Sequence, residues 1–296
     1  MNEYILARDH HAIVRLNHQH FIMKELYGHL IHPSIPLDKE ELKIAVIGTG
    51  SCIWPADLAR HISPRACIDA IDITLEQCPP QSWLLKNINL IVHDVFKPFP
   101  SEMLGKYDIV HAQLLICVIK GNNPREVIGN LMSLLKPNGF LQWNDLNVDA
   151  TRVFPNTDTD FLLKTAATEE MIRFIMKPRE SSNFKYSKLL LPSQDPYAYY
   201  ITHFWASQLG LQFANMGLSD VVFDRHYIAE DYRLAWNMNC VMLFEEFSAR
   251  LEEDTTSEDN PAIAAQLRDV VIRASRELRD GAAISSELVV AVGRKA

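Results

Sequence analysis

Three short stretches of this chain contain residue types that bind a nucleoside. In "VIGTGS", Gly48, Thr49 and Gly50 form a turn after an apolar run, and glycines let a ligand approach the backbone closely. Asp72 ends the next apolar run, 22 residues after Gly50, where a carboxylate can accept hydrogen bonds from both ribose hydroxyls. Asp94 ends a third run, where an acid can accept from an adenine amino group. Together these residues predict a site for a nucleoside-containing cofactor.

The glycine turn narrows the choice of cofactor. A dinucleotide-binding fingerprint needs glycine or alanine at position 53, which is Ile53. A phosphate-binding P-loop needs Gly-Lys-Ser/Thr, and the turn contains no lysine. The G-x-G-x-G pattern of adenosylmethionine-binding proteins is met at Gly48 and Gly50 and missed only at Cys52. The turn therefore favours S-adenosyl-L-methionine.

Histidines are the candidate acid–base groups, because neutral imidazole can remove a phenol or enol proton near pH 7. His20 lies on the apolar face of a predicted helix, as either a hydrogen-bonded core residue or a pocket residue facing substrate. His203 stands beside "YAYYITHFW", whose aromatic residues either pack in the core or enclose an apolar substrate. His226 is a further candidate; a structural or surface role is the alternative for both. No cysteine–histidine spacing fits zinc, so we expect no metal site.

The first 40 residues are predicted to be a helical extension that packs on the main domain. Asp9 is a plausible N-cap, and an apolar face recurs at steps of three and four residues. The positions on this face are Ile13, Leu16, His20, Met23, Tyr27 and Leu30. The same stripe could instead pair two copies of the chain, so a homodimer is an open alternative.

The next part of the chain alternates between strands and helices. Strands are predicted at 42–47, 66–73, 88–94, 107–115 and 140–147, and helices at 55–62 and 123–135. Short apolar strands separated by helices predict an α/β protein whose mostly parallel sheet is covered on both faces. The glycine turn and both aspartates then lie at the carboxyl ends of strands, where open α/β sheets bind ligands.

The remainder is richer in helices. Helices are predicted at 161–177, 195–217, about 230–250 and 260–281, and strands at 218–228 and 286–295. We therefore expect a main domain over 41–296 with a cap insertion at about 150–215 and a helical insertion at about 229–281.

The composition excludes several classes of protein. The chain has 296 residues, is 48% hydrophobic and 22% charged, and carries a formal net charge of -8. An acidic balance without a Lys/Arg run gives no electrostatic reason to bind nucleic acid or an anionic membrane. No apolar run approaches the roughly 18 residues of a membrane span. The five scattered cysteines form no C-x-x-C pair, which favours reduced thiols and a cytoplasmic protein.

Several stretches of the sequence carry a family resemblance. They are "YILARDHHAIVRLNHQH", "GHLIHPSIP", "IGTGSCIW", "IDAIDIT", "FPSEMLGKYDIVHAQLL" and "LMSLLKPNGFLQWND". They resemble the class I S-adenosylmethionine-dependent methyltransferase superfamily, and in particular methyltransferase-like enzymes of fungal secondary metabolism. The close resemblance covers roughly the first half of the chain. It implies a seven-stranded, mostly parallel Rossmann-like sheet with an antiparallel last strand.

The resemblance also implies roles for individual residues. Gly48, Thr49 and Gly50 would line the amino-acid end of the cofactor, Asp72 with Ile73 the ribose, Asp94 with Val95 the adenine, and His111 with Gln113 the methyl-donor side. Four positions depart from the family pattern. Cys52 stands where the family has its third glycine, and Val46 stands where it has an acidic residue. Gln113 stands where an arginine is common. In "WND", which replaces an acidic pair, Asp145 is the one acidic residue.

The function implied is methyl transfer to an oxygen, nitrogen or carbon atom of a small apolar or aromatic secondary metabolite, with His20, His111 or His203 in catalysis. The departures motivate an alternative enzyme class. There the fold catalyses cyclisation, isomerisation or dehydration of a polyketide-derived substrate, with the cofactor a non-reacting scaffold or absent. A third, non-enzymatic hypothesis is a regulatory protein that acts through partners; it predicts an exposed apolar patch and no enclosed pocket.

Overall fold

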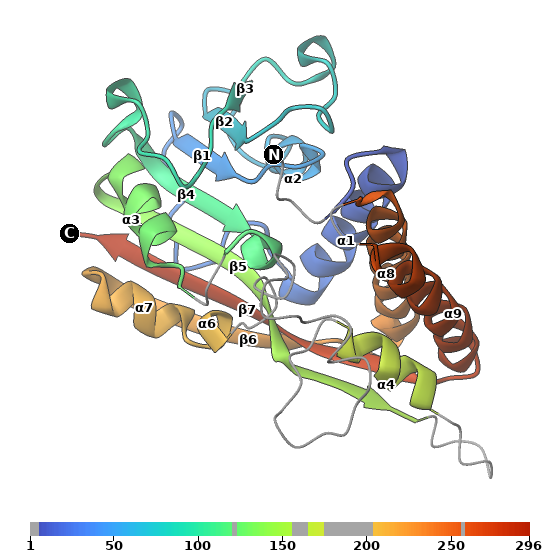
Figure 1. Cartoon of the computed structure of the whole chain (residues 1–296). Coiled ribbons are helices and arrows are strands. Elements are labelled where there is room, and N and C mark those ends of the chain that lie inside the picture. The colour runs from blue at the N-terminus through green and yellow to red at the C-terminus, as the bar shows by residue number, and fades with distance from the viewer. Residues whose placement is uncertain (1–5, 120–122, 156–164, 175–203, 256–257) are drawn as a thin grey trace.

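A central β-sheet organises the chain (Figure 1). The computed structural model describes residues 6–119, 123–155, 165–174, 204–255 and 258–296. Within these ranges the strands are β1 (Lys43–Ile47), β2 (Cys67–Asp72), β3 (Ile88–Val92), β4 (Tyr107–Gln113), β5 (Leu135–Phe154), β6 (Leu218–Tyr227) and β7 (Ala283–Lys295). They form one seven-stranded sheet in the order β3-β2-β1-β4-β5-β7-β6. The pairs among β1 to β5 are parallel, and β7 is antiparallel to β5 and β6, which confirms the predicted sheet.

The position of β1 determines where a ligand can bind. It lies between β2 and β4, so the strand order reverses there and the connections leave in opposite directions. Four of its five residues are buried, because helices cover both faces of the sheet. The polar residues that follow β1 and β2 therefore gather at one edge of the sheet.

Two layers of helices cover the sheet. The helices are α1 (His10–Tyr27), α2 (Ile53–Leu58), α3 (Arg125–Leu134), α4 (Ala166–Arg173), α6 (Phe204–Ser207), α7 (Leu209–Asn215), α8 (Arg233–Glu253) and α9 (Asn260–Arg279). Helices α3, α6 and α7 contribute to one apolar core, and α1, α2, α4, α8 and α9 to the other. Figure 1 shows α1, α8 and α9 grouped away from α3, α6 and α7.

Helix α1 begins as its sequence predicts and ends at Tyr27, before the predicted stripe position Leu30. The Asp9 carboxylate accepts the Ala12 N–H at 2.9 Å, which confirms Asp9 as the N-cap. Gly28 ends the helix with φ +73°, and its N–H donates to the Lys24 carbonyl.

The burial of α1 differs from the single predicted stripe. His20, Met23 and Tyr27 are buried as expected, but Ile13 and Leu16 are only half-buried. A charged residue takes part instead, because Arg15 Nε donates to Glu246 Oε2 of α8 at 2.5 Å with both side chains buried. Helix α1 contacts α2, α8 and β6, so it is packed on more than one side.

Several predicted element bounds need correction. Strand β5 is longer than the predicted 140–147, because "KPNG" continues it as an irregular segment and a second irregularity after Asn147 lets it pair with the start of β7. The predicted 195–217 helix is divided, within the described residues, into α6 and α7. The predicted 161–177 helix is described only as α4. Residues 161–164, 175–177 and 195–203 lie outside the described residues.

Two helix predictions in the second half of the chain agree closely with the structure, whereas the predicted 55–62 helix covers Ile53–Leu58. Helix α9 begins at Asn260 with Pro261 in its first turn, and α8 covers most of the predicted 230–250 helix. Gly217 follows α7 with φ +89°, as its predicted place after a helix requires. The division into a 1–40 extension, a cap insertion and a helical insertion stays a prediction; residues 150–154 belong to β5.

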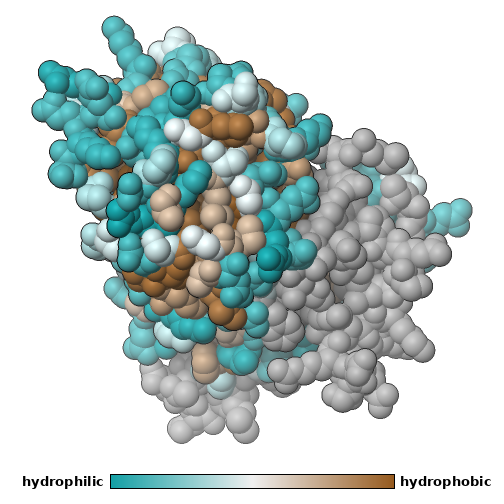
Figure 2. Space-filling view, turned by 90° about the vertical axis from the view of Figure 1, so that its left-hand side faces the viewer, coloured by the Kyte–Doolittle hydropathy of each residue, from teal (hydrophilic) through white to brown (hydrophobic). Residues whose placement is uncertain are grey.

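The surface contains scattered apolar side chains. On the face that Figure 2 shows, hydrophobic residues form a broken band among hydrophilic ones. Among the large apolar residues of the described ranges, Trp83 is the most exposed, with an exposed fraction of 79%. None of the described helices is both long and apolar enough to cross a membrane.

Candidate functional site

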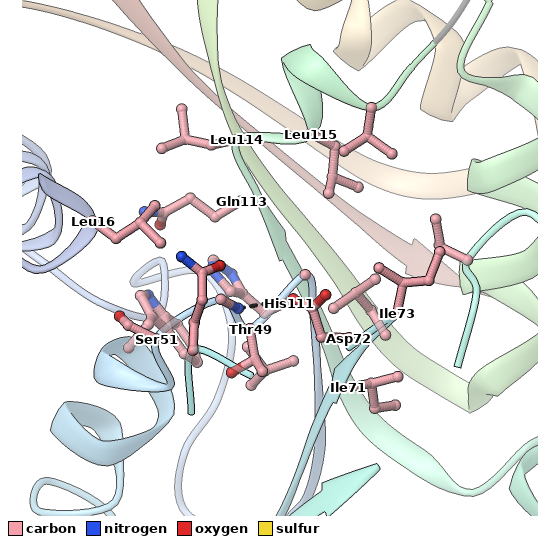
Figure 3. A pocket seen from close by; sticks show the side chains of 18 of the residues that line it. Leu16, Thr49, Ser51, Ile71, Asp72, Ile73, His111, Gln113, Leu114 and Leu115 are labelled. Carbon is pink, nitrogen blue, oxygen red and sulfur yellow. Dashed lines mark hydrogen bonds between the residues drawn. The ribbon is translucent and has the colours of Figure 1, made fainter. Parts of the chain in front are cut away.

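A cavity of about 390 Å³ opens at the carboxyl ends of β1, β2 and β4. This volume lies within the roughly 300–1,000 Å³ of small-ligand pockets. Most of the site residues predicted from the sequence line this cavity. They are Gly48, Thr49, Gly50, Asp72, Ile73, Asp94, Val95 and His111, with His20 and Gln113. Figure 3 shows the side chains of α1 and of the strand ends facing each other across it. His203 lies outside the described residues.

The glycine turn forms one wall of this cavity with bare backbone. Gly48 and Gly50 have φ of +68° and +53°, and Gly48 N–H donates to the Ile71 carbonyl at 2.9 Å. A Cβ on Gly48 would lie 3.0 Å from Leu115 Cδ2, and one on Gly50 would lie 3.3 Å from Leu16 Cδ1. Both leucines line the cavity, so any side chain on the turn would narrow it.

Cys52 keeps the backbone shape of the third glycine. Its φ is +61°, in the left-handed region, at the start of α2. This conformation costs a non-glycine residue about 1–2 kcal/mol. The side chain is 1% exposed and belongs to the apolar core, so burial of the thiol offsets part of that cost. The departure from the motif therefore changes the side chain without changing the turn.

The Asp72 carboxylate faces the glycine turn. Its Oδ2 accepts the Gly50 N–H at 2.9 Å, the hydrogen bond drawn in Figure 3, and Oδ1 accepts the Thr74 N–H at 3.4 Å. Burial raises the pKa of Asp72, against the opposing effects of these N–H groups and of the Arg8 charge. The Ile73 N–H also acts on this carboxylate, and of its about four acceptor positions those left open by the three N–H groups are available to a ligand hydroxyl.

Two stacked aromatic rings line the part of the cavity near Asp94. The His93 and Phe99 rings stack with centroids 4.3 Å apart, and both residues line the cavity. Asp94 Oδ1 accepts the Phe96 N–H at 3.1 Å, so this aspartate shapes its own turn as well as facing the cavity. The aromatic pair suits a planar ring, and no periodic pattern in the sequence indicates it.

His111 is a buried polar group without a partner. Its ring is 0% exposed and stacks on Trp54 with centroids 3.8 Å apart. Neither ring nitrogen makes a hydrogen bond of normal geometry, and Thr49 Oγ1 on the same cavity is also buried without one. Burial lowers the pKa of His111 to about 3, so the ring is neutral and a weak base at neutral pH. Such orphaned atoms fit a polar ligand group that completes their hydrogen bonds.

His20 is better placed than His111 to move a proton. It lines the cavity, and its Nε2 lies 2.9 Å from Asp57 Oδ2. Lys24 Nζ also donates to Asp57 at 2.7 Å. Although burial acts in the opposite direction, the hydrogen bonds of Lys24 and His20 lower the pKa of Asp57, which keeps its carboxylate ionised. Neutral His20 then carries its proton on Nε2 and leaves Nδ1 as the acceptor.

Some residues at the cavity carry no motif in the sequence. Arg8, Gln19 and Trp54 line it, and Asp57 supports His20 from behind. Leu16, Gln19 and His20 follow the helical spacing of α1, which is the signal that could have found them. His226 is elsewhere: its ring contacts Tyr27 edge-on at 5.2 Å and does not line the cavity. The described residues contain no group of three or more His, Cys, Asp or Glu that could hold a metal ion.

The chain is similar to known fungal proteins over part of its length. No protein-family model matches it. It is 30% identical over 139 residues to N-methyltransferase verN of Clonostachys rogersoniana, covering 47% of this chain and 48% of that protein. It is 31% identical over 153 residues to methyltransferase grgD of a Penicillium species, covering 49% and 52%. The chain thus spans about half the length of the curated relatives it matches.

The chain also matches a solved structure of a methyltransferase complex. It is Haemonchus contortus phosphoethanolamine N-methyltransferase 2 with S-adenosyl-L-methionine, at a TM-score of 0.45 and 13% identity. The similarity covers 94% of this chain and 52% of that one.

Proposed function

We propose that this chain is a class I S-adenosylmethionine-dependent methyltransferase that transfers a methyl group to a nitrogen atom of a small secondary metabolite. The observation that carries the proposal is the convergence of Gly48, Gly50, Asp72 and Asp94 on one cavity at the β1 switch point. Nitrogen is favoured over oxygen or carbon because a relative at 30% identity is named an N-methyltransferase.

The residues present fit S-adenosyl-L-methionine. The bare backbone of Gly48 and Gly50 would hold its amino-acid end, with the orphaned ring of His111 supplying a hydrogen bond. Asp72 with Ile73 would hold the ribose, and Asp94 with Val95 the adenine. When bound, this cofactor supplies a methyl group already activated on a sulfonium.

The residues of the chain position the nucleophile and accept its proton. His20 Nδ1 accepts that proton, and Asp57 is the positioning residue that fixes the His20 ring through Nε2. Leu16, Leu114 and Leu115 line the cavity with apolar surface and exclude water from the reacting atoms. These apolar walls support a small apolar or aromatic substrate.

Oligomeric state and location stay predictions. Four positions of the α1 stripe, His20, Met23, Tyr27 and Leu30, are buried within one chain, so a homodimer would use another surface. A cytoplasmic location rests on the cysteine pattern alone.

Calorimetric titration with S-adenosyl-L-methionine and S-adenosyl-L-homocysteine tests the cofactor assignment. We expect both to bind the reduced chain. Methyl-labelled cofactor is then offered with a panel of aromatic and heterocyclic amines, amides and phenols, and labelled product is expected from the nitrogen nucleophiles. Failure of both compounds to bind overturns the proposal. Conversion of a polyketide-type substrate without label transfer supports the cyclase or isomerase alternative instead.

His20→Asn is expected to lower kcat by about 100-fold or more, the usual contribution of a general base. Cofactor affinity should stay within about twofold, because the glycine turn and Asp72 are untouched. His61→Asn is the matched control: His61 Nε2 also contacts Asp57, at 3.3 Å, but from an exposed position away from the cavity. Equal kcat values in the two variants would rule out His20 as the base.

Asp57→Asn separates the base from its positioning residue. The amide offers one acceptor oxygen, for which Lys24 Nζ competes, and an NH2 donor, so the tautomer with its proton on Nε2 and a basic Nδ1 is no longer favoured. We expect kcat to fall with KM nearly unchanged, and the acidic limb of the pH–rate profile to shift. A variant that changes only thermal stability would show that Asp57 has a structural role alone.

A further inference from the structure

Two cysteines lie directly beside the cofactor turn. Cys52 occupies the third position of the glycine motif and is 1% exposed. Cys78 comes from the loop that follows β2, and its Sγ donates to the Gly50 carbonyl at 3.2 Å. It packs against the apolar core to which Cys52 belongs. A thiol from the loop after β2 therefore contacts the same turn that carries Cys52.

The two thiols interact directly with each other. Their contact lowers the pKa of Cys52 and raises the pKa of Cys78 well above its usual range, as expected when Cys78 is the donor of the pair. Their exposure also differs, since Cys52 is buried and Cys78 is half-buried. A small oxidant can therefore reach Cys78 before Cys52.

We propose that Cys52 and Cys78 form a thiol–disulfide modification site that controls the cofactor turn, with a low-molecular-weight disulfide such as oxidised glutathione as the oxidant. The thiol pair loses one proton to solvent, and the remaining proton passes from Cys78 Sγ to Cys52 Sγ, which leaves the thiolate on the half-buried Cys78. This thiolate attacks one glutathione sulfur, which forms a mixed disulfide and releases one glutathione thiolate. The released thiolate takes the proton of Cys52, and the Cys52 thiolate attacks Cys78 Sγ, which forms the protein disulfide and releases the second glutathione. The protein dithiol loses two electrons and two protons, and the glutathione disulfide becomes two thiols.

The effect on the cofactor rests on the proposed function. The disulfide joins the turn that carries Gly50 to the loop that follows Asp72. An S–S bond of about 2 Å is shorter than any thiol–thiol contact, so closing it draws Cys52 toward Cys78. Gly50 lies two residues before Cys52, and its N–H donates to Asp72 Oδ2 at 2.9 Å. The oxidised turn therefore no longer presents Gly50 and Asp72 to the cofactor in the same geometry.

The test treats the reduced full chain with oxidised glutathione and measures its intact mass. We expect a loss of two hydrogens and a peptide that links Cys52 to Cys78. Cys52→Ser should instead retain one glutathione on Cys78, because the resolving thiol is gone. Cys78→Ser should leave Cys52 unmodified, because Cys52 is buried. Cys67→Ser is the control and should behave as the unmodified chain does.

Calorimetry of the oxidised and reduced forms then measures the effect on the turn. We expect the oxidised form to bind S-adenosyl-L-methionine about tenfold more weakly or worse, the effect of about one lost hydrogen bond. Absence of the Cys52–Cys78 peptide overturns the site. A linked chain with unchanged affinity overturns its control of the turn. A linked chain whose reduced form also fails to bind leaves the disulfide site standing and overturns the proposed function.

Discussion

Gly50→Arg is expected to abolish measurable binding of S-adenosyl-L-methionine. Gly50 has φ +53°, and even a Cβ there would lie 3.3 Å from Leu16 Cδ1 across the cavity. An arginine side chain at this point fills the approach to the backbone and places a cation beside Asp72. We expect the affinity to fall by at least about 100-fold, or about 3 kcal/mol at 1.4 kcal/mol per factor of ten. Calorimetric titration of the purified variant measures this loss.

A matched glycine separates lost binding from lost folding. Gly105 has φ +65°, close to that of Gly50, but a Cβ added to it would meet nothing within 4 Å, and it does not line the cavity. Gly105→Arg therefore imposes the same left-handed strain on a non-glycine residue without blocking the ligand. It should bind the cofactor normally. If Gly50→Arg binds as tightly as Gly105→Arg, the turn is not the cofactor site.

That the residues of the proposed cofactor site lie together could be predicted, because topology alone brings them together. Gly48, Asp72 and Asp94 each follow an apolar strand, and parallel neighbouring strands place such residues at one edge of the sheet. No side-chain contact had to be known. The sheet was predictable for the same reason, since buried parallel strands appear as short apolar runs between helices.

The catalytic half depends on contacts that no spacing encodes. His20 meets Asp57 across 37 positions of the chain, and the periodicity of α1 indicates only that His20 is buried. Arg15 pairs with Glu246, 231 positions away, and no spacing in the sequence indicates this pair. The irregular ends of β5 were missed because the first arises from pairing with β4 and the second from pairing with β7. In each case the partner comes from a distant element, and packing determines which face of the helix or strand is buried.

Acid stability is expected to depend on His111 and Asp145 with opposite signs. Burial lowers the pKa of His111 from 6.5 to about 3 and raises the pKa of Asp145 from 3.8 to about 7. Between these limits the unfolded chain binds one more proton than the folded chain at His111, and one fewer at Asp145. Lowering the pH from 6.5 therefore weakens the fold through His111 and strengthens it through Asp145, each by about 1.4 kcal/mol per pH unit.

His111→Phe removes the contribution of His111 to acid destabilisation and keeps an aromatic ring stacked on Trp54. Neither nitrogen of His111 is hydrogen-bonded, so their loss leaves no partner unsatisfied. Relative to the unmodified chain, we expect the variant to gain about 3 kcal/mol of unfolding free energy as the pH falls from 6.5 to about 4.5. Urea unfolding without cofactor, measured at several pH values, gives this difference. A difference that does not change with pH would show that His111 does not titrate on unfolding.

Asp145→Asn tests the contribution of Asp145. The pH dependence of its unfolding free energy, relative to the unmodified chain, is expected to be opposite to that of His111→Phe. The carboxylate accepts from Leu115 N–H at 3.0 Å and Trp143 Nε1 at 2.9 Å, so the amide imposes a constant penalty by offering fewer acceptor positions. Apart from this pH-independent penalty, the unfolding free energy of the variant should rise relative to that of the unmodified chain as the pH rises from 4 to 7. The reason is that only the unmodified chain must ionise a buried acid. Burial also lowers the pKa values of the buried His20 and the half-buried His29, which act in the direction of His111. The unmodified chain should therefore lose stability below pH 6.5, and Asp145→Asn should lose it more steeply.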